Sequence, residues 1–564
     1  MNKKFVTISI LACLITMPMR ATSANDSIDN HYENISRNLD IFNLLYKELD
    51  LYYVDTINTK KIINTGIDAM LDELDPYTIY IPEEKEEDFK FMMTGEYAGV
   101  GASINKIGDY ICFSDIYEGC PADKGGIKCG DRIVEINGKQ AKGKSVSFIS
   151  DMLRGKSGTD IKLVLENPVT EKKRKVTIQR EKIILPNIEY SDTLEAGIGY
   201  IRFSQFTEKS AANFKQAFLE LKEKKKINSL IIDLRNNPGG LLDQATEIVN
   251  YFIENQETIV YTKSKVKELD EVCKAIKQPI DKEIPIVMLV NHNSASASEV
   301  FSGALQDLDR AVIVGERTYG KGLVQTTRNL PFGGKIKVTI SKYYIPSGRC
   351  VQAINYAEKD EDGSVKRIPD SLTTEFKTKH GRIVRDGGGI TPDITIEAQT
   401  LSTISYYLYT ENIIFNYAVD YIAKHPKIAT PKEFKFTEYD DFKAYAKKQN
   451  FSYVLKTEET LKNLKELAKT EGYLDYSKDE FEALEKKLSH NLDQDLKLFE
   501  DEISQLISIE IMKQLYYQKG SIAEALKYDK VKQEAINILK DKTKYNSILQ
   551  PQQKKEETGK GNNK

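Results

Sequence analysis

The chain has 564 residues, 40% of them hydrophobic and 29% charged, which is enough for about three or four folded units. Lysine and arginine number 81 and aspartate and glutamate 84, so the formal net charge is −3. This balance gives no electrostatic support for a nucleic-acid partner. The five histidines are scattered and form no ligand motif, which disfavours a zinc hydrolase, and we expect neither a metal nor a cofactor.

The first two dozen residues have the pattern of an export signal. A basic start precedes an apolar run from Phe5 to Met19, and small residues follow up to Ala24. This order predicts a signal peptide over residues 1–24 and export, most simply to the periplasm. The apolar run is short for a membrane anchor, and the segment before Cys13 is short for a lipoprotein signal, so both alternatives are disfavoured.

The cysteines leave one question open. Five would remain after loss of the signal, an odd number without metal-type spacing, and three of them lie between residues 112 and 129. An oxidising compartment permits a disulfide. Whether two of these cysteines meet does not follow from their spacing.

Changes in pattern divide the rest of the chain into five parts. Residues 25–90 have helical spacing, and residues 91–181 carry short alternating strands with glycine-marked turns. In residues 182–400 apolar strands alternate with helical stretches, which predicts parallel strands covered by helices and a multidomain α/β protein. Residues 401–548 form a charged helical extension, and residues 549–564 are polar and predicted to be disordered.

A turn of small residues follows an apolar strand in the third part. The strand Ile284–Val290 leads into the SASAS string centred on Ser296, and a helical pattern follows. Such a turn can expose a serine hydroxyl beside the backbone amides of a helix start, which suits a nucleophile. Taken alone, the string favours the simpler interpretation that serine and alanine cap and pack the helix.

A second glycine-rich turn contains a candidate general base, Lys321. It follows the strand that ends at Gly315, and a partly desolvated lysine can accept a proton from serine because its pKa falls. The string also fits the GxxxxGK phosphate loop, but Gly322 stands where that loop needs serine or threonine. We therefore expect no nucleotide, and a surface lysine in a turn is the plain alternative.

A third strand end could supply a backbone donor. The apolar strand Leu230–Leu234 opens into Pro238, Gly239 and Gly240. Glycine lets backbone approach a substrate closely, so an amide here could stabilise an oxyanion. An ordinary strand-to-helix loop explains the same residues.

Together the three segments resemble the carboxyl-terminal processing peptidases, also called tail-specific proteases, over roughly residues 75–394. The resemblance implies that Ser296 is the nucleophile, that Lys321 is the base and that Gln325 positions its amine. It also implies an oxyanion hole built from the amides of Ala297 and of one of the two glycines, Gly239 or Gly240. The implied fold is a crotonase/ClpP-like α/β catalytic core with an inserted PDZ domain.

Residues 91–181 resemble a PDZ domain, most clearly in Pro121–Gly138. In such domains a peptide adds as a strand and its terminal carboxylate binds to loop amides. We expect the loop to be Tyr97, Ala98, Gly99, Val100 and Gly101, and the pocket for the last side chain to involve Val100, Ala102 and Ile104. A β-rich packing module without a ligand is the alternative.

These features predict an exported serine endopeptidase with five parts after its signal. They are an N-terminal helical region (25–90), a PDZ domain (91–181), a Ser–Lys peptidase core (182–400), a helical C-terminal domain (401–548) and a tail (549–564). Expected partners are proteins with accessible C-terminal tails, and the C-terminal helices could dock an adaptor or self-associate. Two other functions stay open, a catalytically silent PDZ scaffold and a crotonase-like enzyme acting on acyl thioesters.

Overall fold

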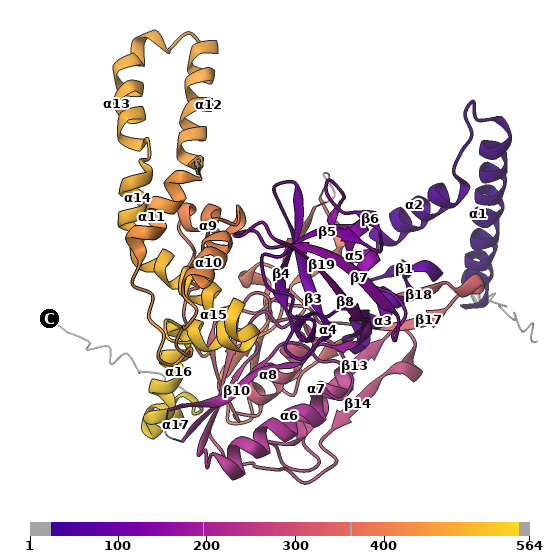
Figure 1. Cartoon of the computed structure of the whole chain (residues 1–564). Helices are drawn as coiled ribbons and strands as arrows, with labels where there is room; N and C mark the ends of the chain where they lie inside the picture. Colours follow the sequence, from indigo (N-terminus) through magenta and orange to yellow (C-terminus); the bar gives the residue numbers. More distant parts are fainter. Residues whose placement is uncertain (1–23, 196, 361–363, 450, 552–564) are drawn as a thin grey trace, which may run out of the picture. The chain divides into compact units, whose positions relative to one another are not determined.

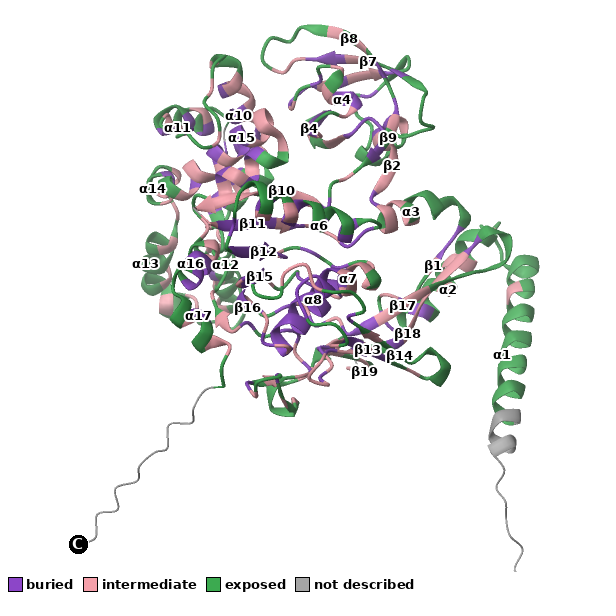
Figure 2. Ribbon diagram, turned by 90° about the horizontal axis from the view of Figure 1, so that it is seen from below, coloured by how far each residue is buried: buried purple, intermediate pink, exposed green. Residues whose placement is uncertain are grey.

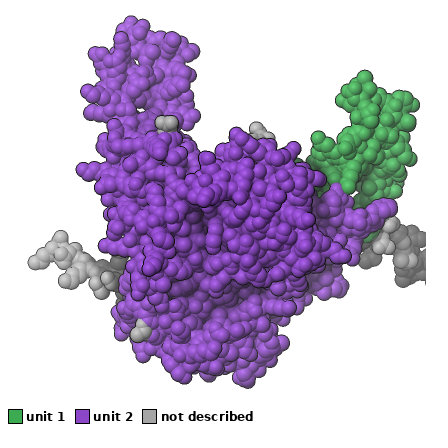
Figure 3. Space-filling model, in the orientation of Figure 1, with its two compact units in different colours: residues 1–76 green, residues 77–564 purple. Residues whose placement is uncertain are grey.

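The computed structural model describes residues 24–195, 197–360, 364–449 and 451–551. The predicted signal peptide, apart from its last residue, and most of the predicted tail lie outside the described residues. The chain divides into two compact units, residues 1–76 and 77–564 (Figure 3). The described part of the first unit contains two helices, α1 (Ala24–Tyr52) and α2 (Thr59–Asp72), where helical spacing was predicted. The predicted helical region extended to residue 90, but residues 77–90 belong to the second unit and include a strand, β1 (Ile79–Ile81), because it pairs with a strand far along the chain.

A six-stranded sheet forms the centre of the second unit (Figure 1). Its order is β10-β11-β12-β15-β16-β23, and five neighbouring strands are parallel, which confirms the predicted β–α alternation. The parallel strands are β11 (Ile198–Phe203), β12 (Ser229–Asp233), β15 (Ile286–Val290), β16 (Val312–Gly315) and β23 (Ile394–Thr395). The edge strand β10 (Ile188–Glu195) is antiparallel and had not been predicted.

Three helices cover one face of this sheet. They are α6 (Ser210–Leu219), α7 (Leu242–Asn250) and α8 (Ala297–Asp307), and they pack with the sheet around edge-to-face phenylalanine rings, including Phe203, Phe206, Phe214, Phe252 and Phe301. Every residue of α8 is buried, as Figure 2 shows by its purple ribbon. The helix that begins at the predicted nucleophile therefore lies in the middle of the core.

The last helices of the chain cover the other face. Leu230 and Ile232 of β12 point into the first layer, whereas Ile231 packs against α16 (Lys530–Lys540) and α17 (Lys542–Ile548). A parallel sheet with two apolar faces needs helices on both sides. The end of the C-terminal helical part therefore belongs to the core, because it completes an α/β/α sandwich.

The remaining C-terminal helices build a core of their own. Residues such as Tyr417, Phe442 and Ile507 form it, and its helices are α9 (Thr403–Thr410), α10 (Ile413–Lys424), α11 (Tyr439–Lys448), α14 (Leu492–Leu498) and α15 (Glu500–Ala525). The helices α12 (Lys456–Thr470) and α13 (Lys478–Leu488) lie between α11 and α14 in the chain and contribute none of their described residues to this core. Figure 1 shows α12 and α13 side by side as a projecting hairpin. Among the described residues, no helix has both the length and the apolar character that a membrane span requires.

A separate β-rich module occupies the second part of the chain. Its sheet has the order β3-β4-β5-β7-β8, with β6 paired to β5, and short helices α4 and α5. The bounds are β3 (Ala102–Ile107), β4 (Tyr110–Ile116), α4 (Pro121–Lys124), β5 (Arg132–Ile136), β6 (Lys139–Gln140), α5 (Val146–Leu153), β7 (Asp160–Glu166) and β8 (Lys173–Gln179). The structure thus has short strands in the part of the chain, residues 91–181, where they were predicted. A ribbon of β2 (Glu96–Gly99) and β9 (Glu181–Ile184) borders the module in sequence.

Sequence patterns had not indicated a second sheet, which lies beside the core. It joins β1 (Ile79–Ile81), β18 (Lys335–Tyr344), β13 (Thr258–Ser264) and β14 (Glu271–Lys274), with β17 (Leu323–Asn329) also paired to β18. Most of its side chains are only partly buried, so its strands lack the apolar runs that marked the core strands. Helix α3 (Glu86–Thr94) and the hairpins β19–β20 (Ile354–Lys359, Val365–Arg367) and β21–β22 (Glu375–Lys377, Ile383–Arg385) complete the fold.

The packing of α16 on the central sheet predicts that its core residues stabilise that sheet. Ile536 is 1% exposed and belongs to the cluster that covers the sheet. Ile536→Ala should lower the free energy of unfolding by about 2–5 kcal/mol, measured as a lower thermal midpoint for the unfolding of the sheet. The matched control, Ile276→Ala at a 74% exposed position, should change the midpoint little. An unchanged midpoint for the sheet in Ile536→Ala would show that these helices fold independently of it.

Candidate active site

The predicted nucleophile lies on a strained turn between a buried strand and a buried helix. Ser296 precedes α8 and has φ 55° and ψ −115°, a left-handed backbone conformation that a non-glycine residue rarely adopts. Its neighbours Ala295 and Ala297 are buried, while Ser296 itself is half-buried. Strain of this kind persists only where surrounding contacts fix it, and it is typical of active sites.

The predicted base lies on the loop after the next strand. Lys321 lies between β16 and β17, two residues before the first residue of β17. The loop begins at Gly315, with φ 126°, where a side-chain Cβ would lie 2.1 Å from the carbonyl oxygen of Val290. Only glycine fits there, because the loop passes directly over the end of β15.

One buried carboxylate joins the two turns. Oε2 of Glu299 accepts the backbone N–H groups of Ser296, at 2.9 Å, and of Lys321, at 2.8 Å. Its Oε1 accepts the Gly320 amide at 2.7 Å and the Thr318 hydroxyl at 2.6 Å. Glu299 has no exposed surface, and burial raises its pKa to about 7 although the four hydrogen bonds act in the opposite direction. The structure therefore brings Ser296 and Lys321 together through a shared acceptor.

A tyrosine makes a second connection between the same residues. The hydroxyl of Tyr343, on β18, lies 3.2 Å from the carbonyl oxygen of Ser296 and also contacts that of Lys321. Tyr343 is 2% exposed, and burial raises its pKa well above the usual range, so it stays a neutral donor. The peptide groups of the two predicted catalytic residues are thus tied on their N–H and on their C=O sides.

Gln325 lies four residues beyond the lysine, on β17. Its Nε2 donates to Oγ1 of Thr339 on the neighbouring strand β18, at 3.2 Å. This bond fixes the amide so that its remaining acceptor, Oε1, is the atom that could bind an amine.

The two predicted glycines lie directly against the serine turn. A Cβ on Gly239 would lie 2.8 Å from the Ala297 nitrogen and 2.9 Å from Cβ of Ser296, and one on Gly240 would lie 2.1 Å from the carbonyl oxygen of Phe206. The Gly239 amide donates to Oδ1 of Asn237 at 2.9 Å. Ala297 is the first residue of α8, where helix amides lack intrahelical acceptors.

The predicted peptide-binding residues of the β-rich module divide into two groups. Tyr97, Ala98 and Gly99 were expected in a loop but form strand β2, because they pair with β9 in register. Val100 is 2% exposed and packs in the core of the module, so only its backbone and that of Gly101 form the turn before β3. Ala102 and Ile104 lie on β3, an edge strand that is next to α5.

Three residues of the site had not been singled out from the sequence. Glu299 lies three residues after the serine of the SASAS string, but only the fold shows that Glu299 and Tyr343 bridge two loops. Tyr77 comes from far along the chain, and its ring centroid lies 4.0 Å from Nζ of Lys321. The only available signal was its place after the helix-breaking Asp75-Pro76 pair.

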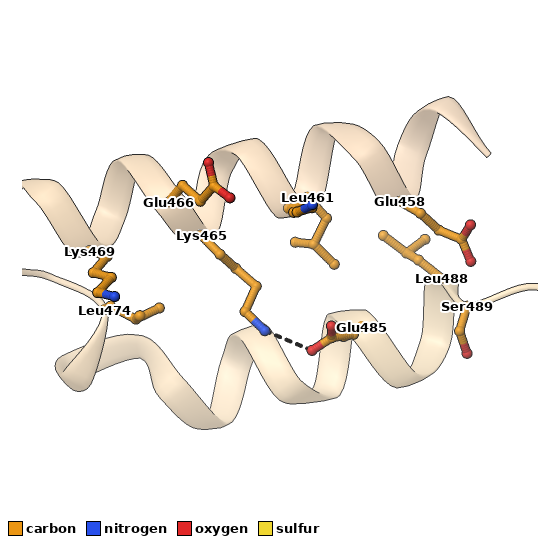
Figure 4. Close-up of a pocket in the computed structure, with 10 residues that line it drawn as sticks. Glu458, Leu461, Lys465, Glu466, Lys469, Leu474, Glu485, Leu488 and Ser489 are labelled. Carbon is orange, nitrogen blue, oxygen red and sulfur yellow. Dashed lines mark hydrogen bonds and ion pairs between the residues drawn. The ribbon is translucent and has the colours of Figure 1, made fainter. Parts of the chain in front are cut away.

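Other features of the described residues are not connected with this chemistry. The five cysteines in the described part of the chain are free thiols, which answers the open question about a disulfide. A groove of about 410 Å³ lies between α12 and α13, where Lys465 pairs with Glu485 at 2.7 Å (Figure 4). None of the predicted site residues lines it.

Comparison with known proteins identifies the parts of the chain. Residues 197–361 match the model of peptidase family S41, residues 113–167 match a PDZ domain, and residues 404–539 match the C-terminal helical domain of probable PDZ-proteases. The chain is 35% identical over 354 residues to a probable CtpA-like serine protease of Staphylococcus aureus, covering 62% of this chain and 70% of that protein. It belongs to the carboxy-terminal-processing protease family.

The family therefore makes this chain a serine-type peptidase with a PDZ domain, as predicted. A second member, the carboxy-terminal-processing protease of Bartonella bacilliformis, is 35% identical over 346 residues, which cover 61% of this chain and 78% of that protein. Among solved structures, the photosystem II D1 C-terminal processing protease is 26% identical with a TM-score of 0.34, covering 64% of this chain and 92% of that one.

The role of Glu299 can be tested in the intact protease. Glu299→Gln replaces one carboxylate oxygen with an NH₂ group, which cannot accept a hydrogen bond. At least one of the buried groups that donate to Glu299 then loses its acceptor, which costs about 1–3 kcal/mol for each group. We expect kcat/KM to fall by roughly 10- to 100-fold, measured by peptide hydrolysis, with the fold kept. Glu283→Gln, at an exposed position, is the matched control and should leave kcat/KM unchanged. Equal activity of both variants would contradict the bridging role.

Proposed function

We propose that this protease is an exported Ser–Lys endopeptidase that captures substrate C-terminal tails through its PDZ domain. Ser296 is the nucleophile and Lys321 the general base. The observation that carries this proposal is the double tie between them, through the Glu299 carboxylate and the Tyr343 hydroxyl. These two connections hold the backbones of the strained serine and of the lysine in a fixed relative position, and no histidine takes part in them.

The proposed reaction proceeds through an acyl-enzyme. Nζ of Lys321, as a free amine, takes the proton of the Ser296 hydroxyl while Oγ attacks the scissile carbonyl carbon. The resulting ammonium then gives this proton to the leaving amine, and the carbon–nitrogen bond breaks. Water then gives a proton to the same amine as it attacks the ester carbonyl carbon. The bond from this carbon to Oγ breaks, the ammonium returns the proton to Oγ of Ser296, and the second product leaves as an acid. Gln325 would orient the amine through its Oε1.

The oxyanion would be stabilised by two backbone amides. Ala297 supplies one, since it is the first residue of a buried helix whose dipole also favours negative charge. For the second donor we favour Gly240, because the Gly239 amide already donates to Asn237. Gly239 then serves by letting the two loops approach each other.

The PDZ domain would select substrates by their tails. The free edge of β3 suits an added peptide strand, and the turn at Val100 and Gly101 suits the terminal carboxylate. The structure of the PDZ domain of a Vibrio cholerae carboxy-terminal protease was solved in complex with a peptide, which agrees with this use. Substrates would be proteins with accessible apolar tails, and an adaptor or a second copy could bind the C-terminal helices.

The finer assignments of fold and location form part of the same proposal. The parallel sheet with helices on both faces is consistent with a crotonase/ClpP-like core at residues 182–400. The other proposed parts of the chain are the PDZ domain at 91–181 and the helical parts at 25–90 and 401–548. A signal at residues 1–24 would direct the chain to the periplasm. The helices α16 and α17 lie outside residues 182–400 in the chain, but they pack on the sheet of that core.

Substitution of the dyad tests the mechanism. Ser296→Ala and Lys321→Ala should each lower kcat by about four orders of magnitude on a loosely folded reporter with an apolar tail. The exposed-lysine variant Lys265→Ala should cleave like the parent. Cleavage by the Lys321→Ala protein at the parental rate would rule out the lysine as base.

A pair of glycine substitutions tests tail capture. Gly101 has φ 72°, and a Cβ there would lie 2.2 Å from Cβ of Cys120, whereas Gly108 has φ 59° and no atom within 4 Å of such a Cβ. Gly101→Ala should therefore distort the turn and raise KM for a tailed substrate about tenfold. Gly108→Ala is the matched control, because it introduces the same kind of backbone strain without the steric clash. Cleavage of a short peptide with an amidated C-terminus should be equal in both. An unchanged KM in Gly101→Ala would contradict the proposal that this turn captures substrate tails.

A further inference from the structure

The amine of Lys321 lies against the face of an aromatic ring. Its Nζ is 4.0 Å from the ring centroid of Tyr77, a residue 244 positions earlier in the chain. The Tyr77 hydroxyl is in turn 3.2 Å from the hydroxyl of Tyr356 and 3.4 Å from that of Tyr319, and the rings of Tyr77 and Tyr356 meet edge to face. The ring that faces the lysine is therefore fixed by two other tyrosines.

This contact has a direct electrostatic consequence. The face of an aromatic ring carries partial negative charge, so it attracts an ammonium more strongly than a neutral amine. Burial raises the pKa of the Tyr77 hydroxyl far above its usual range, so the ring stays neutral. The contact between this ring and Nζ of Lys321 is therefore stronger when the amine is protonated.

We propose that Tyr77 is a positioning residue for the general base: its ring holds Nζ of Lys321 and stabilises the ammonium that forms when the amine takes the proton of Ser296. The inference rests on the proposed function, since it needs Lys321 as the base. It assigns a catalytic contribution to the segment that precedes the PDZ domain, which lies outside the residues matched to the peptidase family.

The other titratable groups around Lys321 do not carry a competing positive charge. Glu299 on α8 bonds to the lysine backbone, and Tyr319, Tyr343 and Tyr356 are phenols. Burial also raises the pKa of the Cys350 thiol, which therefore stays protonated near neutral pH. Burial raises the pKa of Glu299 to about 7, and Glu299 is unchanged in the variants compared below.

The sign of the expected pH effect follows from the ring. Removing it destabilises the ammonium, so the pKa of Lys321 falls and the free amine persists to lower pH. In Tyr77→Leu the acid limb of kcat/KM should move to lower pH by about 0.5–1.5 units. The plateau of kcat should also fall by about three- to thirtyfold, because a weaker and less firmly held base accepts the proton less readily. Tyr77→Phe keeps the ring and should retain the parental limb.

The experiment is a pH–rate profile of the full chain with one tailed peptide, for the parent, Tyr77→Leu, Tyr77→Phe and the exposed control Tyr476→Leu, with thermal midpoints of each. Where Tyr77→Leu unfolds early, Tyr77→Met fills the space without a ring. The proposal is overturned if the acid limb of the ring-less variant stays in place or moves to higher pH. It is also overturned if the Tyr77→Phe profile matches that of the ring-less variant.

Lys321→Ala, assayed in parallel, distinguishes failure of this inference from failure of the proposed mechanism. If Lys321→Ala still cleaves, the proposed mechanism fails. If Lys321→Ala is inactive and the Tyr77→Leu profile coincides with that of the parent, only the role of Tyr77 is refuted.

Discussion

A single buried carboxylate connects the two proposed catalytic residues of this protease. Glu299 accepts the amides of Ser296 and Lys321 on one oxygen, and without it only the Tyr343 hydroxyl would link the two loops. The arrangement is demanding, because an unpaired buried carboxylate is strongly unfavourable. Its four donors satisfy it, and they are supplied only when both loops are in place. The carboxylate thus makes the geometry of the serine and of the lysine interdependent.

The rest of the core supports that carboxylate. Glu299 lies in the first turn of α8, a helix without an exposed residue, which the sheet and the phenylalanine cluster enclose. The sheet needs a second apolar cover, and α16 and α17 provide it from the far end of the chain. Tyr77, which precedes the PDZ domain in the chain, contacts the amine of Lys321. Segments before and after the matched peptidase region therefore contact the proposed site or the sheet that carries it.

Much of this could be predicted from local sequence, and some could not. The strand-turn-helix around Ser296 and the parallel core strands have continuous apolar runs that mark them clearly. Strands β17 and β18 are only half-buried, so their pattern was too weak to indicate a sheet. Tyr97–Gly99 was assigned to a loop, since its pairing with β9 depends on residues about 85 positions later. Bridges such as Glu299 and contacts such as Tyr77 depend on tertiary structure, which spacing does not encode.

The most direct test is a crystal structure of the protease bound to a peptide boronic acid with an apolar tail. The account predicts a bond from boron to Oγ of Ser296, a boronate oxygen near the amides of Ala297 and Gly240, and Nζ of Lys321 within about 3 Å of Oγ. The Ser296 and Lys321 amides should still share Oε2 of Glu299. Boron bound elsewhere, or a lysine amine far from Oγ in the bound state, would contradict it.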